Sequence, residues 1–184
     1  MSVLRAFTHA RRAAARVAIM AVAGIAFAGT NARAADATAG GPEVVREFFA
    51  ALETMDIERF LKVWDERGVQ IMPFAPAGFP QRLEGRAAIR QQYEGLPKNF
   101  ASMKFPDLQI YRTTDPAVVW ATWRGEIRIK ATGKPYNNRY AGLFKLRDGR
   151  VIEFHEYFNP LILLEAFGDA ESLQRNYNVK PETR

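Results

Sequence analysis

The sequence predicts an α+β domain: a cone-shaped, curved antiparallel sheet covered by three N-terminal helices and followed by a short C-terminal helix. The first observation is that apolar residues recur three or four positions apart through the first half of the chain. The second is a switch to alternating apolar and polar residues from Lys104 onward. Helices followed by a run of strands are typical of this class, so helices on one face of a single sheet are expected.

The helical part is expected to begin after residues 35–42, whose small and polar side chains predict a flexible lead-in. A first helix should start at Pro42, because apolar side chains follow it at helical spacing. Asp56 is the predicted N-cap of a second helix, which extends to Trp64. A third helix is expected after Gly85.

The strands form the second half of the domain. Their predicted ranges are 104–113, 117–130, 137–147 and 150–158. Asp148-Gly149 separates the last two strands, and this pair accepts the positive φ angles of a tight hairpin turn. The domain therefore spans residues 43–168, with a C-terminal tail at 169–184. The pattern leaves open whether the sheet and the helices enclose a packed core or a cone-shaped pocket.

Residues 1–34 have the composition of a signal peptide. A basic, acid-free start precedes the 13-residue apolar run 17–29, and Ala32-Arg33-Ala34 supplies the small residues of a cleavage site before Ala35. This run is short for a membrane span, and an uncleaved anchoring helix is the alternative. We expect export by the general or the twin-arginine route, a periplasmic or secreted protein, and no stable membrane association after cleavage.

The composition argues against several classes of function. The net charge of +6 falls to +1 without residues 1–34, which hold five arginines and no acidic residue, so nucleic-acid binding is not expected. There is no cysteine, and His155 is the only histidine after residue 34, which argues against a disulfide or a zinc site. Because phosphate-binding loops and serine-nucleophile motifs are also absent from the sequence, no cofactor or metal is predicted.

Three stretches carry a resemblance to the SnoaL-like group of the nuclear-transport-factor-two-like superfamily. They are "LEGRAAIRQQYEGLP" at 83–97, "NNRYAGLFKLRDGRVIEFHEYFNP" at 137–160, and the helix pair around "FFAALETMDIERFLKVWDE". The resemblance covers residues 43–168 and implies a deep pocket for small, often cyclic, hydrophobic ligands. It also implies a homodimer formed through the outer sheet face. The group includes ketosteroid isomerases, polyketide cyclases and the phenazine-biosynthesis A/B proteins.

Glu156 is the catalytic candidate. It shares one strand face with Phe154 and Phe158, where a carboxylate is unexpected. Burial on that face would raise the pKa of the carboxyl toward neutrality, which suits a general acid or base. The resemblance to the phenazine A/B proteins implies the same role for the Glu of "HEYFNP". The alternative is a structural carboxylate that pairs with an arginine or accepts hydrogen bonds from the following turn.

A further set of residues is predicted to bind the ligand. It consists of Trp64, Asp65, Trp123, Asn138, Tyr140, Phe154 and Phe158. The aromatic members suit either a cavity wall or a packed core, and relatives often place a pocket-facing acid near the position of Asp65. Asn138 and Tyr140 are polar groups on the inward parity, as stabilisation of a developing negative charge requires.

Three functions remain open at this point. The first is a cofactor-free isomerase, cyclase, or hydratase or hydrolase, in which Glu156 moves a proton within a pocket that binds a small hydrophobic molecule. The second is a non-catalytic binding or carrier module that uses the same pocket. The third is a structural domain with a filled core. A second polar group within reach of the ligand atom next to Glu156 would favour the enzyme.

Overall fold

The computed structural model describes the backbone of residues 29–168 and the side chains of residues 40–168. Most of the predicted signal peptide and the predicted tail at 169–184 lie outside the described residues. The helices are α1 (Gly29–Thr54), α2 (Ile57–Lys62), α3 (Gly85–Tyr93), α4 (Leu96–Asn99) and α5 (Pro160–Phe167). The strands are β1 (Trp64–Ile71), β2 (Arg82–Glu84), β3 (Phe100–Lys104), β4 (Gln109–Arg112), β5 (Val118–Arg124), β6 (Glu126–Ile129), β7 (Pro135–Tyr136), β8 (Arg139–Arg147) and β9 (Arg150–Phe158).

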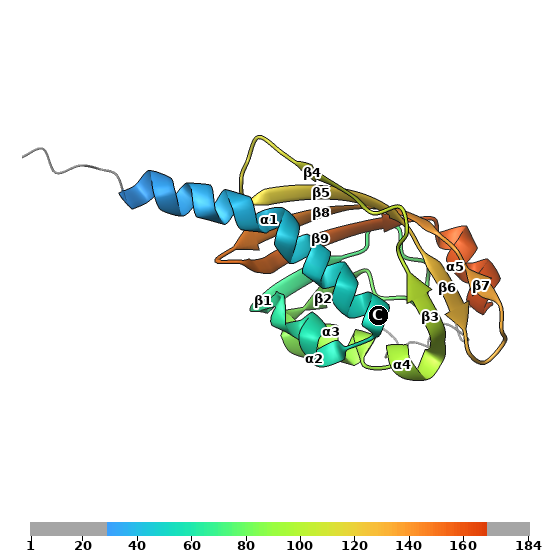
Figure 1. Ribbon diagram of the computed structural model, residues 1–184. Coiled ribbons are helices and arrows are strands. Elements are labelled where there is room, and N and C mark those ends of the chain that lie inside the picture. The colour runs from blue at the N-terminus through green and yellow to red at the C-terminus, as the bar shows by residue number, and fades with distance from the viewer. Residues whose placement is uncertain (1–28, 169–184) are drawn as a thin grey trace, which may run out of the picture.

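The predicted α+β class is confirmed. A six-stranded sheet has the order β2-β1-β9-β8-β5-β4, and a small sheet has the order β3-β6-β7. The sheet is curved and unclosed, with α1 crossing it and α5 beside β7 at one end (Figure 1). One pairing departs from the antiparallel prediction, because β1 runs parallel to β9. The chain between these two strands is long enough for such a connection.

Two of the predicted strands are each divided between the two sheets. The range 104–113 contains β4 but only the end of β3, and 117–130 breaks into β5 and β6 at Gly125. Gly125 donates its N–H to the carbonyl of Asn138 at 2.9 Å, and a Cβ there would lie 3.3 Å from the Tyr140 ring. The missing side chain therefore permits the bend that carries β6 into the small sheet.

The first helix is longer than predicted. α1 begins at Gly29, so residues 35–42 are helical rather than a flexible lead-in, and Pro42 lies inside the helix rather than at its start. Alanine has the highest helix propensity, and the alanines of this segment offset its small polar residues. The N-terminal part of α1 extends past the edge of the sheet (Figure 1). Among residues 29–168, no helix has the length and apolar content needed to cross a membrane.

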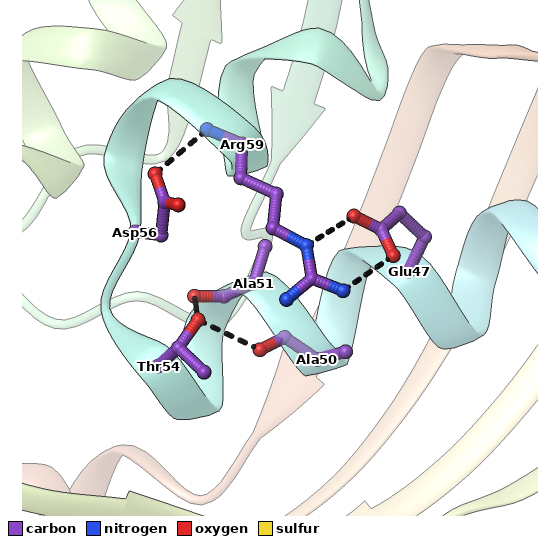
Figure 2. Close-up of polar contacts among 6 residues, drawn as sticks. All are labelled: Glu47, Ala50, Ala51, Thr54, Asp56 and Arg59. Carbon is purple, nitrogen blue, oxygen red and sulfur yellow. Dashed lines mark hydrogen bonds and ion pairs between the residues drawn. The ribbon is translucent and has the colours of Figure 1, made fainter.

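A polar cluster fixes the corner between α1 and α2 (Figure 2). Asp56 caps α2 as predicted, because its carboxylate accepts the Arg59 N–H at 2.9 Å. The Arg59 side chain returns to α1, where its Nη2 donates to Glu47 at 2.7 Å. The second helix ends at Lys62, and Trp64 opens β1 instead of extending the helix. This early end decides where Trp64 and Asp65 point.

Phe48 of α1 lies at the centre of the core. Its ring meets those of Phe60, Phe144 and Phe154 edge-on, with centroid distances of 4.9 to 5.2 Å. Phe144 and Phe154 stack on each other at 4.2 Å across β8 and β9. These contacts fill one end of the space between α1 and the sheet. The other end stays hollow.

Candidate functional site: an aromatic pocket around Glu156

The inward side chains of the sheet differ in size from one row to the next along the strands, and this difference creates the pocket. The row of Val119, Phe144 and Phe154 across β5, β8 and β9 belongs to the packed core. The next row along the strands consists of Ala121, Gly142 and Glu156, and the third consists of Trp123, Tyr140 and Phe158. Small residues beside Glu156 and aromatic residues beyond it leave a cavity of about 80 Å³ between α1, α3 and the sheet.

The wall of the cavity is mostly aromatic. Trp123 and Tyr140 stack with parallel rings at 5.1 Å, and Phe79 from the loop after β1 meets Phe158 at 6.1 Å. Among the described residues that line the cavity, Glu156 is the only aspartate, glutamate, lysine or arginine, and the other groups able to titrate are tyrosines. The ionised carboxylate therefore has no opposing positive charge on the pocket wall.

Glu156 is half-buried and faces the cavity from β9. Gln70 Nε2 donates a hydrogen bond of 2.9 Å to Glu156 Oε2. Burial raises the pKa of the Glu156 carboxyl from 4.5 to about 7, although the hydrogen bond from Gln70 opposes this rise. The side chain can therefore exist in both protonation states near neutral pH, as a general acid or base must.

Gly142, the cross-strand partner of Glu156, makes room for the aromatic wall. A Cβ at this position would lie 2.7 Å from the Phe154 ring and 2.8 Å from the Trp123 ring. Both rings lean over the bare backbone of Gly142 and reach the space that a side chain would otherwise occupy. The glycine is needed for this close approach, because any larger residue would force the rings apart.

Two polar residues beside Glu156 were missed by the sequence analysis. Gln70 of β1 has no accessible surface, and Tyr93 at the end of α3 lines the cavity. Its apolar neighbours Val69 and Ile71 are partly exposed, and Gln70 between them takes the inward position on the strand. Met72 could have indicated the inward direction of Gln70, because residues two apart in a strand share a face and Met72 is buried.

Tyr136 and Tyr140 add hydroxyl groups to the wall opposite α3. Burial raises the pKa of Tyr136, while hydrogen bonds with Tyr140 and Asn138 act in the opposite direction. Asn138 itself is fully buried, and it is not part of the cavity lining. Its amide donates to the Asn159 carbonyl at 2.9 Å and accepts from the N–H of Arg139 at 2.8 Å. The side chain ties β8 to the start of α5.

Of the predicted site residues, the structure brings Glu156, Trp123, Tyr140 and Phe158 to the cavity. Trp64 and Phe154 lie in the packed core behind it, and Asn138 supports the junction before α5. Asp65 points away from the cavity, because α2 ends before it and the strand places it on the other face. Its carboxylate lies 3.6 Å from Arg147 and accepts the Arg67 N–H, which lowers its pKa. Within residues 40–168 no group of three His, Cys, Asp or Glu side chains is placed to hold a metal ion.

Asn138→Ala is expected to lower the unfolding free energy by about 2 kcal/mol, because it removes three part-buried hydrogen bonds between the fully buried Asn138 side chain and the backbone of Asn159 and Arg139. Urea unfolding measures this change. The matched control is Asn137→Ala, which removes one bond of 3.2 Å from an exposed residue and should cost about 1 kcal/mol or less. Equal stability of Asn138→Ala and the parent would contradict the structural role and restore Asn138 as a ligand-binding candidate.

Comparison with known proteins places the chain in a family. A family model described as a SnoaL-like domain matches residues 45–154. The uncharacterised protein YesE of Bacillus subtilis is 36% identical over 126 residues, which cover 68% of this chain and 86% of YesE. An uncharacterised PhzA/B-like protein of Pseudomonas aeruginosa is 28% identical over 130 residues, which cover 71% of this chain and 92% of the relative.

Solved structures agree with this placement. The crystal structure of a Bacillus subtilis protein, provisionally described as an isomerase, is 34% identical with a TM-score of 0.67 and covers 72% of this chain and 95% of its own. A phenazine biosynthesis-related protein of Pseudomonas aeruginosa, at 19% identity and a TM-score of 0.62, covers 84% of this chain and 96% of its own and shares the fold. The chain belongs to the SnoaL-like family of the nuclear-transport-factor-two-like fold.

Proposed function

We propose that the pocket binds a small, neutral, hydrophobic molecule, and that Glu156 moves a proton on it without a cofactor. The observation that carries this proposal is a cavity-facing carboxyl whose pKa is raised to about 7 by burial, with no cation on the pocket wall among the described residues. Burial without a paired charge costs stability whenever the group is ionised. Such an arrangement is typical of groups that exchange protons with a ligand.

The chemistry of the wall limits the ligand. A carboxylate or phosphate would meet Glu156 and no lysine or arginine on the lining, so a neutral molecule is favoured. The volume of about 80 Å³ is smaller than an apolar cavity that holds benzene, which is roughly 150 Å³. The cavity as it stands is therefore too small for a six-membered ring, and ring-sized ligands require aromatic side chains such as Phe79 to move.

The reaction class that fits is proton abstraction next to a carbonyl. The carboxylate of Glu156 takes the proton, the C–H electron pair forms a C=C bond, and the carbonyl π electrons move to the oxygen. The hydroxyls on the wall can donate hydrogen bonds to that oxygen. In a ligand whose C=C bond is conjugated with the enolate, return of the proton from Glu156 to the far carbon completes an isomerisation. Attack of the enolate carbon on a second carbonyl carbon forms the C–C bond of a cyclisation, and the resulting alkoxide takes the proton back from Glu156. The isomerase description of the Bacillus subtilis relative supports this class.

Hydrogen exchange in a simple ketone tests the proposal without knowledge of the natural ligand. The full chain is incubated with cyclopentanone in D₂O, and the loss of the hydrogens next to the carbonyl is followed by proton NMR. Protein-catalysed exchange should increase as pH rises through about 7, because Glu156 then becomes ionised. Binding of the ketone without exchange at any pH would instead support the carrier module.

A homodimer is predicted from the outer face of the sheet. Tyr111, Trp120, Leu143, His155 and Ile71 form one register row across five strands, and Tyr111 is 49% exposed. Such a continuous, largely apolar row suits contact with a second copy of the chain. Light scattering should give about twice the chain mass of 20.8 kDa, less any cleaved segment. A mass of one chain at all concentrations would contradict this prediction.

Export is predicted from residues 1–34 and places the domain in the periplasm or outside the cell. N-terminal sequencing of protein recovered from its native compartment should begin near Ala35. Cleavage there would leave most of α1, including all its residues that line the pocket. Recovery of the intact chain from the cytosol would contradict the prediction.

A further inference from the structure

The starting point is one buried amide that contacts two groups of the pocket. Gln70 Nε2 lies 2.9 Å from Glu156 Oε2 and 2.8 Å from the Tyr93 hydroxyl. The Tyr93 hydroxyl also donates to Gln70 Oε1 at 3.0 Å. Gln70 has no accessible surface, so water does not compete for these bonds. The three side chains come from β1, α3 and β9, which are distant in sequence.

The charge of Glu156 decides how the amide is oriented. An ionised carboxylate only accepts hydrogen bonds, so Gln70 must present its nitrogen to Glu156. That nitrogen carries two hydrogens, one for Glu156 and one for the shorter contact with Tyr93. In this arrangement Tyr93 accepts a hydrogen bond from Gln70 Nε2 at 2.8 Å and directs its own hydrogen to Gln70 Oε1 at 3.0 Å, the longer of the two contacts. A ligand carbonyl in the cavity can replace Gln70 Oε1 as the acceptor of that hydrogen.

A ligand in the pocket can provide this acceptor. Both Tyr93 and Glu156 line the cavity, and one nitrogen atom holds both of them. We propose that Gln70 is a positioning residue that aims Glu156 and Tyr93 at one ligand, and that Tyr93 donates the hydrogen bond to the ligand's carbonyl oxygen. This inference rests on the proposed function and adds the hydroxyl donor that the enolate requires. It also supplies the second polar group that favours an enzyme over a carrier.

The surroundings of Tyr93 agree with this role. Burial and the negative charge of Glu156 raise the pKa of Tyr93 well above its usual range, so the phenol keeps its hydrogen at every working pH. The charge of Glu156 also raises the pKa of Tyr136, but the Tyr136 hydroxyl is hydrogen-bonded to Tyr140 and Asn138. Tyr93 is thus the hydroxyl that shares a hydrogen-bond partner with the proposed base.

Two variants test the proposal. Tyr93→Phe removes one oxygen atom and keeps the ring that packs on Phe60 at 4.6 Å. Gln70→Met keeps the length of the side chain and removes both donors. The matched controls are Tyr111→Phe and Gln109→Met, which make the same changes on the exposed strand β4. All are made in the full chain and probed with cyclopentanone labelled with ¹³C at the carbonyl.

Binding should move the carbonyl resonance of the labelled ketone downfield in the parent and in both controls, because a hydrogen-bond donor polarises the carbonyl. Tyr93→Phe should lose this shift and slow hydrogen exchange by roughly 10²–10³-fold. Its Glu156 carboxyl, observed by ¹³C NMR and assigned with Glu156→Gln, should titrate as in the parent. Gln70→Met should raise the pKa of Glu156 further, since a donor to the anion is lost, and slow exchange by about 10²-fold.

The proposal is overturned if Tyr93→Phe keeps the parent's carbonyl shift, because the hydroxyl then faces Gln70 and not the ligand. It is also overturned if the parent shows no shift, or if Gln70→Met leaves the titration of Glu156 unchanged. Failure of the proposed function looks different. A parent that shifts the carbonyl resonance but does not exchange the ketone's hydrogens would refute proton abstraction and leave the assignments of Gln70 and Tyr93 standing.

Discussion

Glu156→Gln is expected to slow ketone hydrogen exchange by roughly 10²–10⁴-fold while keeping the fold and the bound ketone. Glutamine has nearly the same shape as glutamate, and its amide oxygen can still accept the bond from Gln70, but it cannot take up a proton. The rate is measured in D₂O as for the parent. An unchanged rate would remove Glu156 from the mechanism.

The same substitution should raise stability at alkaline pH. The pKa of Glu156 is raised from 4.5 to about 7 on folding, so the native state binds more protons than the unfolded state between these values. The parent therefore loses stability as pH increases from 4.5 to 7, by an amount on the order of 3 kcal/mol if the whole rise is realised. Glu156→Gln lacks this loss, and its advantage in urea unfolding should be largest above pH 7.

Glu153→Gln is the matched control, three residues earlier in the same strand and on the outer face. Hydrogen bonds from Lys145 and His155 lower the pKa of Glu153. Its ionised form is therefore favoured by folding, and its replacement should lower stability at neutral pH. The two substitutions are therefore expected to change the unfolding free energy in opposite directions, with a loss at position 153 and a gain at position 156. If Glu156→Gln instead lost several kcal/mol, the residue would be a structural anchor.

Phe48→Ala is expected to lower the unfolding free energy by about 3–5 kcal/mol. The ring is 2% exposed and holds α1 against the aromatic residues of the sheet, so its removal leaves a void that these neighbours cannot fill. Phe48 also lines the cavity, and the void should connect with it. Urea unfolding measures the loss, and the variant should gain binding of larger ketones.

The control for this variant is Phe74→Ala, the same truncation at a side chain that is 60% exposed. It should change stability by about 0.5 kcal/mol or less. A loss below 1 kcal/mol for Phe48→Ala would contradict the central position of this ring. It would also show that the core at the packed end of the sheet can collapse around the missing side chain.

Strand periodicity predicted the inner face of the sheet and therefore much of the pocket. The parity of β9 placed Glu156 with Phe154 and Phe158, and that of β8 placed Tyr140 inward, which the structure confirms. A bulge between Lys145 and Leu146 shifts the register of β8 against β9, but only beyond these residues. The alternation of inward and outward residues within each strand was sufficient to predict this face, because the neighbouring strands show the same alternation.

The rest of the site depends on pairings that local patterns do not encode. Gln70 reaches Glu156 because β1 lies parallel to β9, a contact between residues 86 positions apart. Asp65 was misplaced because the spacing to Trp64 continued the helical pattern, while the helix itself stops at Lys62. Whether an aromatic residue lines the cavity or fills the core depends on small neighbours such as Gly142, which no single-residue pattern reveals.

The titration of Glu156 tests the central claim most directly. The full chain is labelled with ¹³C at the glutamate carboxyl carbons, the resonance of Glu156 is assigned by its absence in Glu156→Gln, and its position is followed over pH. The half-buried, cavity-facing carboxyl of Glu156 should titrate at a pKa of about 7. A midpoint at or below 4.5, the ordinary value for glutamate, would contradict the account.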